Sequence, residues 1–134
     1  MAAPFVFIGT HRVKLGKREA FQRYFADFCS DVVEPQEPRL LSFYGYAAPD
    51  SDLVTVVQVH PDAKSMLTHM AVGKEHFAAA YAEYLEPDST IQVYGTPNPE
   101  VLQTMAVLAQ VDSDADSPVV VCEPFAGFDR LERR

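Results

Sequence analysis

Residues 66–81 read MLTHMAVGKEHFAAAY, and this spacing predicts an amphipathic helix. At about 100° per residue, the apolar residues 66, 70, 73 and 77 fall in one narrow sector, with His69 and His76 together at its margin. A strand signal ending at His60 comes just before, and Pro61-Asp62 is typical of a helix start. The stretch therefore predicts a strand followed by a helix whose histidines can face a cavity.

The sequence on either side alternates strand and helix signals. Apolar, β-branched and aromatic runs predict four strands, over residues 5–12, 40–46, 53–60 and 90–94. A phenylalanine-rich stripe predicts another helix over residues 17–33, and turn residues at 47–52 make a hairpin of the two middle strands. The resulting order over residues 4–96, β-α-β-β-α-β, is that of a ferredoxin-like α+β fold with an antiparallel sheet.

Both faces of this predicted sheet are apolar or aromatic, so neither is expected to face water. A second copy packed face to face would cover the outer face and form a dimeric α/β barrel. Alternate residues of a strand point to opposite faces, which divides the strand residues into two sets. The set made up of hydrocarbon side chains is predicted to face the helices: Val6, Ile8, Leu41, Phe43, Val57, Val59, Ile91 and Val93. The other set mixes aromatic rings with donors and acceptors and is expected to line the interior: Phe5, Phe7, His11, Tyr44, Tyr46, Gln58, His60, Gln92 and Tyr94. A one-residue register shift in any strand would exchange its two sets.

Composition limits the class of protein. The 134 residues fit one domain, with a core over 4–96 and a C-terminal extension over 97–134. The net charge of −8 disfavours nucleic acid, and no apolar run is long enough to predict a membrane span. Only Cys29 and Cys122 are present, which is typical of buried thiols in a reducing compartment, so we expect a cytoplasmic protein.

The extension has signals of its own. Asn98-Pro99-Glu100 predicts a short helix, and residues 112–117 predict a polar linker. Residues 119–122 predict a strand that must add to an open sheet edge, of this chain or of a partner. The apolar residues 125–128 would then pack in the core or plug a pocket mouth.

Three segments resemble the antibiotic biosynthesis monooxygenase family of dimeric α/β barrels: GTHRVKLGKREAF (9–21), VTVVQVHPD (54–62) and THMAVGKEHFAAAY (68–81). The resemblance implies a homodimer that oxidises a small aromatic polyketide or quinol-like compound with molecular oxygen and without a cofactor. Such a site needs a dry aromatic cavity, a base and hydrogen bonds to an oxyanion. The same architecture also serves isomerases or cyclases and non-enzymatic ligand-binding or stress-response proteins, and these remain alternatives.

Haem and metal chemistry are disfavoured. Where haem-degrading relatives carry an asparagine and an axial histidine, this chain carries His11 and Ala80, and it has no tryptophan. Asp62, His69 and His76 recur every seven residues, but each step spans about 10.5 Å of helix, too far for shared metal coordination.

Histidine is the side chain whose unperturbed pKa suits a base near neutral pH. His60 and His11 end neighbouring strands and are the candidate catalytic pair, one as base and the other as oxyanion donor, with His69 reaching over from the helix. Gln58 and Tyr94 are candidate positioning groups, and Phe7, Tyr44 and Tyr46 complete the predicted substrate lining. His76 is expected at the solvent edge of its helix.

Overall fold

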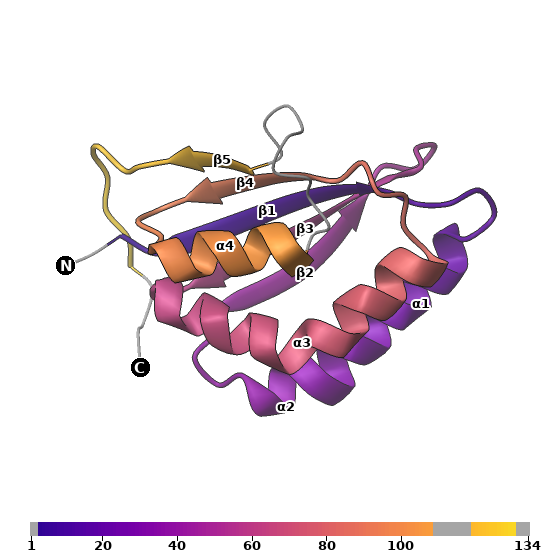
Figure 1. The fold of residues 1–134 in the computed structure, drawn as a ribbon, viewed down its shortest axis with the longest axis horizontal. Helices are drawn as coiled ribbons and strands as arrows, with labels where there is room; N and C mark the ends of the chain where they lie inside the picture. The colour runs from indigo at the N-terminus through magenta and orange to yellow at the C-terminus, as the bar shows by residue number, and fades with distance from the viewer. Residues whose placement is uncertain (1–2, 109–118, 131–134) are drawn as a thin grey trace.

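The computed structural model describes residues 3–108 and 119–130. The elements follow in the predicted order: β1 (Phe5–Arg12), α1 (Arg18–Phe28), a π-helix (Cys29–Val33), α2 (Glu34–Gln36), β2 (Ser42–Ala47), β3 (Leu53–His60), α3 (Ala63–Glu83), β4 (Thr90–Tyr94), α4 (Pro99–Leu108) and β5 (Val119–Cys122). The sheet order is β2-β3-β1-β4-β5, antiparallel except that β5 runs parallel to β4. The helices lie on one side of the sheet (Figure 1). The predicted ferredoxin-like α+β fold is confirmed.

Both predicted helix starts are also confirmed. Asp62 caps α3, because its Oδ1 accepts a hydrogen bond of 2.9 Å from the backbone N–H of Ser65. Asn98 caps α4 in the same way, accepting 2.8 Å from the N–H of Val101. In the part of the chain that the structure describes, no helix is long and apolar enough to cross a membrane.

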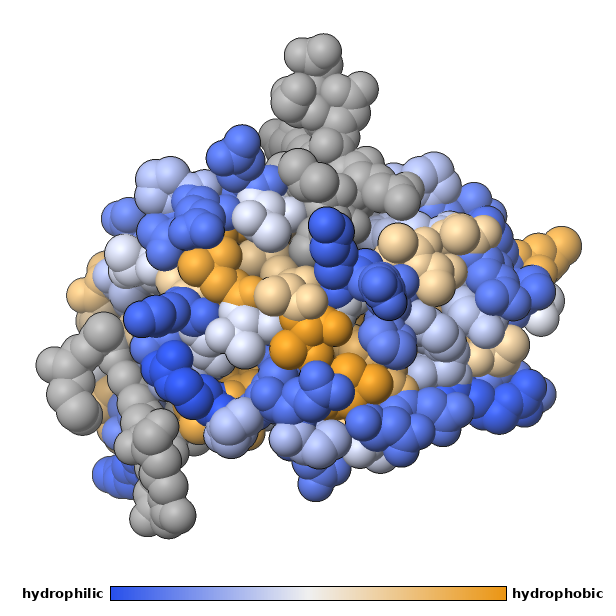
Figure 2. Space-filling view, turned by 60° about the horizontal axis from the view of Figure 1, so that its bottom comes forward, coloured by the Kyte–Doolittle hydropathy of each residue, from blue (hydrophilic) through white to orange (hydrophobic). Residues whose placement is uncertain are grey.

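The core lies between the sheet and the helices. One cluster joins β1 and β4 to α3 and α4, with Phe7, Met66, Val93 and Met105 among its buried members. Hydrophilic residues cover much of the helix-bearing side, with apolar residues gathered near its middle (Figure 2). The C-terminal extension therefore completes the core, since α4 buries Val101 and Met105 there.

The predicted assignment of side chains to the two faces is right for β2 and β4 and wrong for β1 and β3. Phe7 stands opposite both Gln58 and Val93 in the strand register, so all three point to the helices. The residues that face the helices, against prediction, are Phe5, Phe7, His11, Gln58 and His60; Val6, Ile8, Val57 and Val59 face outward instead. The assignment followed polarity and put the hydrocarbon side chains against the helices, but in β1 and β3 the polar residues His11, Gln58 and His60 face the helices, so each strand is reversed.

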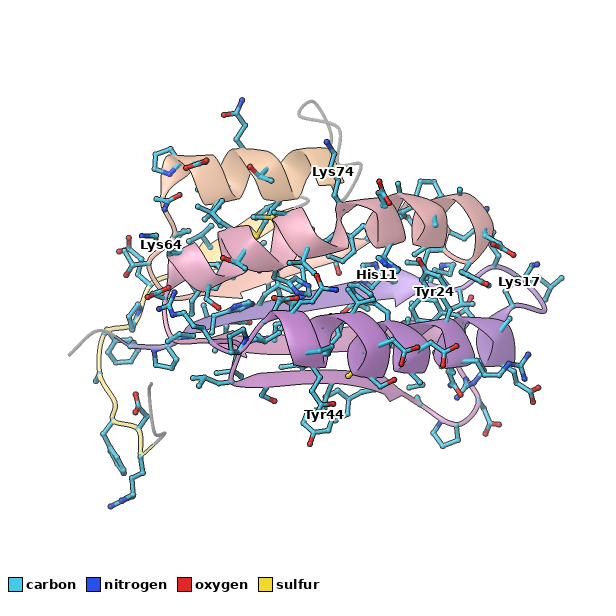
Figure 3. The ribbon with its side chains drawn as sticks, turned by 90° about the horizontal axis from the view of Figure 1, so that it is seen from below. His11, Lys17, Tyr24, Tyr44, Lys64 and Lys74 are labelled. Carbon is cyan, nitrogen blue, oxygen red and sulfur yellow. The ribbon has the colours of Figure 1, made fainter. Side chains whose placement is uncertain are left out.

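The end of the chain differs from expectation in one respect. β5 adds to β4 of its own chain, pairing Ile91 with Val119 and Tyr94 with Cys122. Phe125 and Phe128, however, are almost fully exposed in this chain, so the predicted plug or core packing of 125–128 is wrong. The physical reason is that this segment leaves β5 away from the helices (Figure 3). The predicted linker at 112–117 lies outside the described residues.

Candidate functional site

A cavity of about 110 Å³ lies between the sheet and the helices. Its wall is largely aromatic and apolar, and the polar residues in it are His11, Tyr24, Gln58, His69, His76 and Tyr81. Among the predicted substrate-binding residues, Phe7, Gln58 and His69 line this cavity. Tyr44, Tyr46 and Tyr94 do not, because they stand on the opposite face of the sheet; Tyr44 projects away from the helices in Figure 3.

The most distinctive polar group in the wall is His69. Its side chain is completely buried, and Nδ1 lies 2.8 Å and 3.0 Å from the two carboxylate oxygens of Glu37, which is 2% exposed. A carboxylate only accepts, so Nδ1 carries the proton, and in the neutral form of the ring Nε2 holds a lone pair. Nε2 is buried and has no hydrogen-bond partner among the described residues. His69 lines the cavity, whereas Glu37 does not.

The π-helix after α1 brings Glu37 into position. A continuous α-helical stripe from Phe28 would bury Val32, but Val33 is the buried residue, five positions on. Glu37 follows one turn later, and its N–H donates to the carbonyl of Val33 at 2.9 Å. The extra residue in the π-turn thus rotates Glu37 inward, under His69.

Aromatic rings surround the imidazole of His69. The ring centres of Phe28, Phe43 and Phe77 lie 6.3, 5.2 and 5.4 Å from its own. Gly73 leaves them room, because a Cβ there would lie 2.6 Å from Cζ of Phe77 and 3.0 Å from Cζ of Phe28. These rings exclude water from the free nitrogen, and a polar interaction gains strength in such surroundings.

His60 stands behind the cavity wall, not in it. Its Nδ1 lies 2.7 Å from Oγ of Ser65, and its Nε2 lies 2.9 Å from Oε1 of Gln58. Burial, followed by the nearby His69, lowers the pKa of His60 to about 3. With both nitrogens engaged inside the protein, His60 is placed to orient Gln58.

His11 belongs to a separate polar cluster. Its Nδ1 lies 2.7 Å from Oγ of Ser89, to which the hydroxyl of Tyr81 donates at 2.9 Å. Burial lowers the pKa of His11 to about 4 and raises that of Tyr81. His11 and Tyr24 appear between α1 and α3 in Figure 3.

The expected convergence of His11 and His60 is wrong. In the antiparallel register His60 stands opposite Phe5 and His11 opposite Val54, so the two histidines occupy opposite ends of the strand pair. β1 and β3 are neighbours, as predicted, but they run antiparallel, so their carboxyl ends lie at opposite edges of the sheet.

His76 is half-buried, against the predicted solvent edge. Its ring stacks on Phe28 with centres 4.5 Å apart, and its backbone carbonyl accepts a hydrogen bond of 2.7 Å from the Tyr24 hydroxyl. It therefore forms part of the aromatic wall.

Four polar residues of the site were missed from the sequence: Tyr24, Glu37, Tyr81 and Ser89. Glu37 lies in EPQEP, where two prolines and a second glutamate are typical of a solvated helix end. The available signal was His69 itself, since a histidine buried in an apolar helix stripe needs a polar partner. Tyr81 lies one turn after Phe77 on the same helix and could have been placed by that spacing.

No group of three or more histidine, cysteine or acidic side chains among the described residues is arranged to hold a metal ion. Ala80, at the expected axial position of a haem-degrading relative, packs in a hydrophobic cluster with Phe21 and Leu85. The residues at that position thus do not fit a haem iron.

Fold and site together define a ferredoxin-like α+β domain with an internal aromatic cavity and a buried Glu–His pair. No protein-family model matches the chain, and no curated protein matches it in sequence. Among solved structures it is similar to MupZ from Pseudomonas fluorescens, with a TM-score of 0.70 and 20% identity over 95% of this chain and 94% of that one. It is also similar to PA3566 from Pseudomonas aeruginosa, with a TM-score of 0.60 and 16% identity over 73% of this chain and 98% of that one.

A third similar structure, from Caulobacter crescentus, is named a "putative antibiotic biosynthesis monooxygenase". Its TM-score is 0.59, with 18% identity over 72% of this chain and 92% of that one. The chain therefore has the fold of antibiotic biosynthesis monooxygenase-like proteins, as its motifs predicted. At these identities the likeness concerns the fold alone, so the activity has to be argued from the cavity.

Proposed function

We propose that this protein is a cofactor-independent monooxygenase that acts on a small quinol-like aromatic compound in the cavity beneath α3. The observation that carries the proposal is the Nε2 atom of His69, which is buried without a partner among the described residues and belongs to a cavity-lining ring held by Glu37. This atom is placed to act as a general base, with Glu37 orienting the ring.

The chemistry needs only the substrate, oxygen and this base. His69 takes a proton from a ring hydroxyl, and the substrate anion gives one electron to O2. The two radicals combine at a ring carbon to form a peroxide. Loss of water then leaves one oxygen atom in the product, so that a 1,4-quinol and O2 give a hydroxyquinone and water. The aromatic wall favours this route, because a dry cavity strengthens every polar interaction made with the anion.

The size of the cavity favours a single ring. A dry cavity of about 150 Å³ is known to accept benzene. The cavity here, about 110 Å³, would admit one ring after small movements of its phenylalanine and methionine side chains. A fused polyketide would need a larger opening, so we propose the quinol as the substrate type.

We further propose a homodimer formed through the open face of the sheet. Tyr44 and Tyr46 are 61% and 56% exposed there, beside the outward-facing Val57 and Val59. An apolar face of this kind usually meets a partner, and a twofold axis would let one patch cover itself. Within the proposal, the dimer supports the sheet beneath the cavity, and the protein acts in the cytoplasm.

An isomerase or cyclase is the second candidate. The observation that favours it is the cluster of His11, Tyr81 and Ser89, which adds a hydroxyl to a cavity wall that already holds the His69 base. Proton removal at one group and return at another would move a double bond or close a ring without oxygen.

The test is to incubate single-ring hydroquinones with the protein in air and under nitrogen, and to follow oxygen uptake and the product mass in ¹⁸O2. The monooxygenase predicts oxygen uptake and one labelled atom in the product. Conversion that is equally fast under nitrogen, without label, supports the isomerase. Ligand binding with no conversion in either atmosphere would contradict both and leave a binding protein.

A further inference from the structure

Gln58 borders the same part of the cavity as His69. In the strand register Gln58 stands opposite Phe43, and the ring of Phe43 lies 5.2 Å from that of His69. All three residues line the cavity, and Gln58 is only 4% exposed. A ligand resting on Phe43 would therefore have both polar groups beside it.

The hydrogen bonds behind the wall determine which end of the Gln58 amide is free. The carbonyl oxygen Oε1 is 2.9 Å from Nε2 of His60, whose Nδ1 is 2.7 Å from Oγ of Ser65. A neutral imidazole donates from one nitrogen and accepts at the other. Because Oε1 of Gln58 can only accept, Nε2–H of His60 donates to it, and Nδ1 accepts from the Ser65 hydroxyl. The amino group of Gln58 then remains for the cavity.

Ser65 is itself held in place. It lies in the first turn of α3, and its N–H donates to the capping carboxylate of Asp62 at 2.9 Å. Ser65 and His60 are both buried and lie outside the cavity wall. Hydrogen bonds thus run without a break from the cap Asp62 through Ser65 and His60 to Gln58, and they oppose a flip of the Gln58 amide.

We propose that Gln58 is the oxyanion donor of this site, and that with His69 it selects ligands that bear an acidic O–H or C–H next to an oxygen that takes up the negative charge. This inference deepens the proposed function, on which the role of His69 rests, by naming the substrate class: phenols and enolisable aryl ketones. His69 Nε2 accepts the proton, the amino group of Gln58 donates to the anionic oxygen, and His60 is a positioning residue. Amines and hydrocarbons of the same size gain no binding free energy from His69 and Gln58, because they form no anionic oxygen.

The test uses 4-nitrophenol, whose absorbance reports its ionisation, and 4-nitrotoluene as an isostere without the hydroxyl. In the Gln58→Met variant we expect affinity for the phenolate to fall about 10- to 100-fold, and the pKa of the bound phenol to rise by one to two units. Binding of 4-nitrotoluene should stay within about threefold. Gln22→Met, exposed on α1, is the matched control and should match wild type.

The positioning role of His60 needs its own variant. His60→Phe keeps a ring and removes both hydrogen bonds, so the phenolate preference should fall by roughly tenfold while 4-nitrotoluene still binds. If Gln58→Met does not fold, Gln58→Glu replaces it: the size is kept, the donor becomes an acceptor, and the phenolate should be rejected more strongly.

Equal phenolate affinity in wild type and the Gln58 variant would overturn the inference, as would wild-type protein that prefers 4-nitrotoluene. Binding here requires no turnover. A protein with the phenolate preference but no oxygen uptake would therefore contradict the proposed oxygenase and leave this inference standing.

Discussion

Replacing both members of the Glu37–His69 pair should restore the stability that either single replacement removes. Glu37→Leu leaves Nδ1 of a completely buried histidine without its carboxylate, and His69→Phe leaves a carboxylate that is 2% exposed without its donor. Breaking a buried pair in this way costs about 3–5 kcal/mol. An apolar pair of similar volume avoids both penalties, so the double variant should unfold within about 1 kcal/mol of wild type.

Urea unfolding of the four proteins gives the coupling energy directly as a double-mutant cycle. In a domain of this length the single replacements should lower the melting temperature by roughly 10–20 °C. Glu34→Leu, on the exposed side of α2, is the control and should change the free energy of unfolding by less than about 0.5 kcal/mol. Single effects that simply add in the double variant would refute the buried pair. The double variant should also lack turnover, since it regains stability without a base.

Three further results are expected. Val57→Asp, at the centre of the open sheet face, should turn the dimer into a monomer in sedimentation velocity, because it places a carboxylate without a partner in an apolar interface; wild-type protein that is already monomeric at micromolar concentration would contradict the proposed interface. Gly73→Ala should weaken ligand binding about tenfold, because its Cβ displaces two rings of the cavity wall, while the melting temperature changes little because alanine favours the helix by about 1 kcal/mol; unchanged affinity would count against the cavity as the binding site. The free energy of unfolding should decrease as the pH falls from 6.5 to about 4, since the unfolded chain binds protons that His11 and His60, with pKa values lowered to about 4 and about 3, do not take up when folded. In His60→Gln the slope of this free energy against pH, measured by urea unfolding, should be about half as steep. An unchanged slope would be inconsistent with a buried neutral His60.

The order of elements was predictable because each has a strong local signal. The bounds of β1, β3 and β4 match the predicted runs, and the caps Asp62 and Asn98 mark the starts of α3 and α4. These signals depend on residues close in sequence, which a single chain displays directly.

The faces of β1 and β3 were not predictable in this way. A strand whose polar residues all face water shows its orientation in the sequence. In β1, Phe5 and Val6 are both apolar, and in β3 the polar Gln58 faces the helices while the apolar Val57 faces outward. Orientation was decided by the neighbours in the sheet, which local sequence does not reveal.

The candidate site was predictable in part. The histidine at position 69 was placed beside a cavity by helical spacing, but its partner Glu37 was not found. The contact joins residues 32 positions apart through a π-turn, which breaks the 3.6-residue period used to read the sequence. The sequence shows which residues of this region are polar but not which of them face the cavity and which stand behind its wall.

The most direct test of the account is the rate of hydroquinone oxidation by His69→Asn, measured as oxygen uptake at saturating substrate. Asparagine keeps a polar group in the space and removes the base, so a folded variant with wild-type ligand affinity should turn over about 10²- to 10⁴-fold more slowly. Thr68→Ala, exposed on the same helix, should retain the wild-type rate. If His69→Asn also oxidises hydroquinones at the wild-type rate, His69 is not the base and the central claim is wrong.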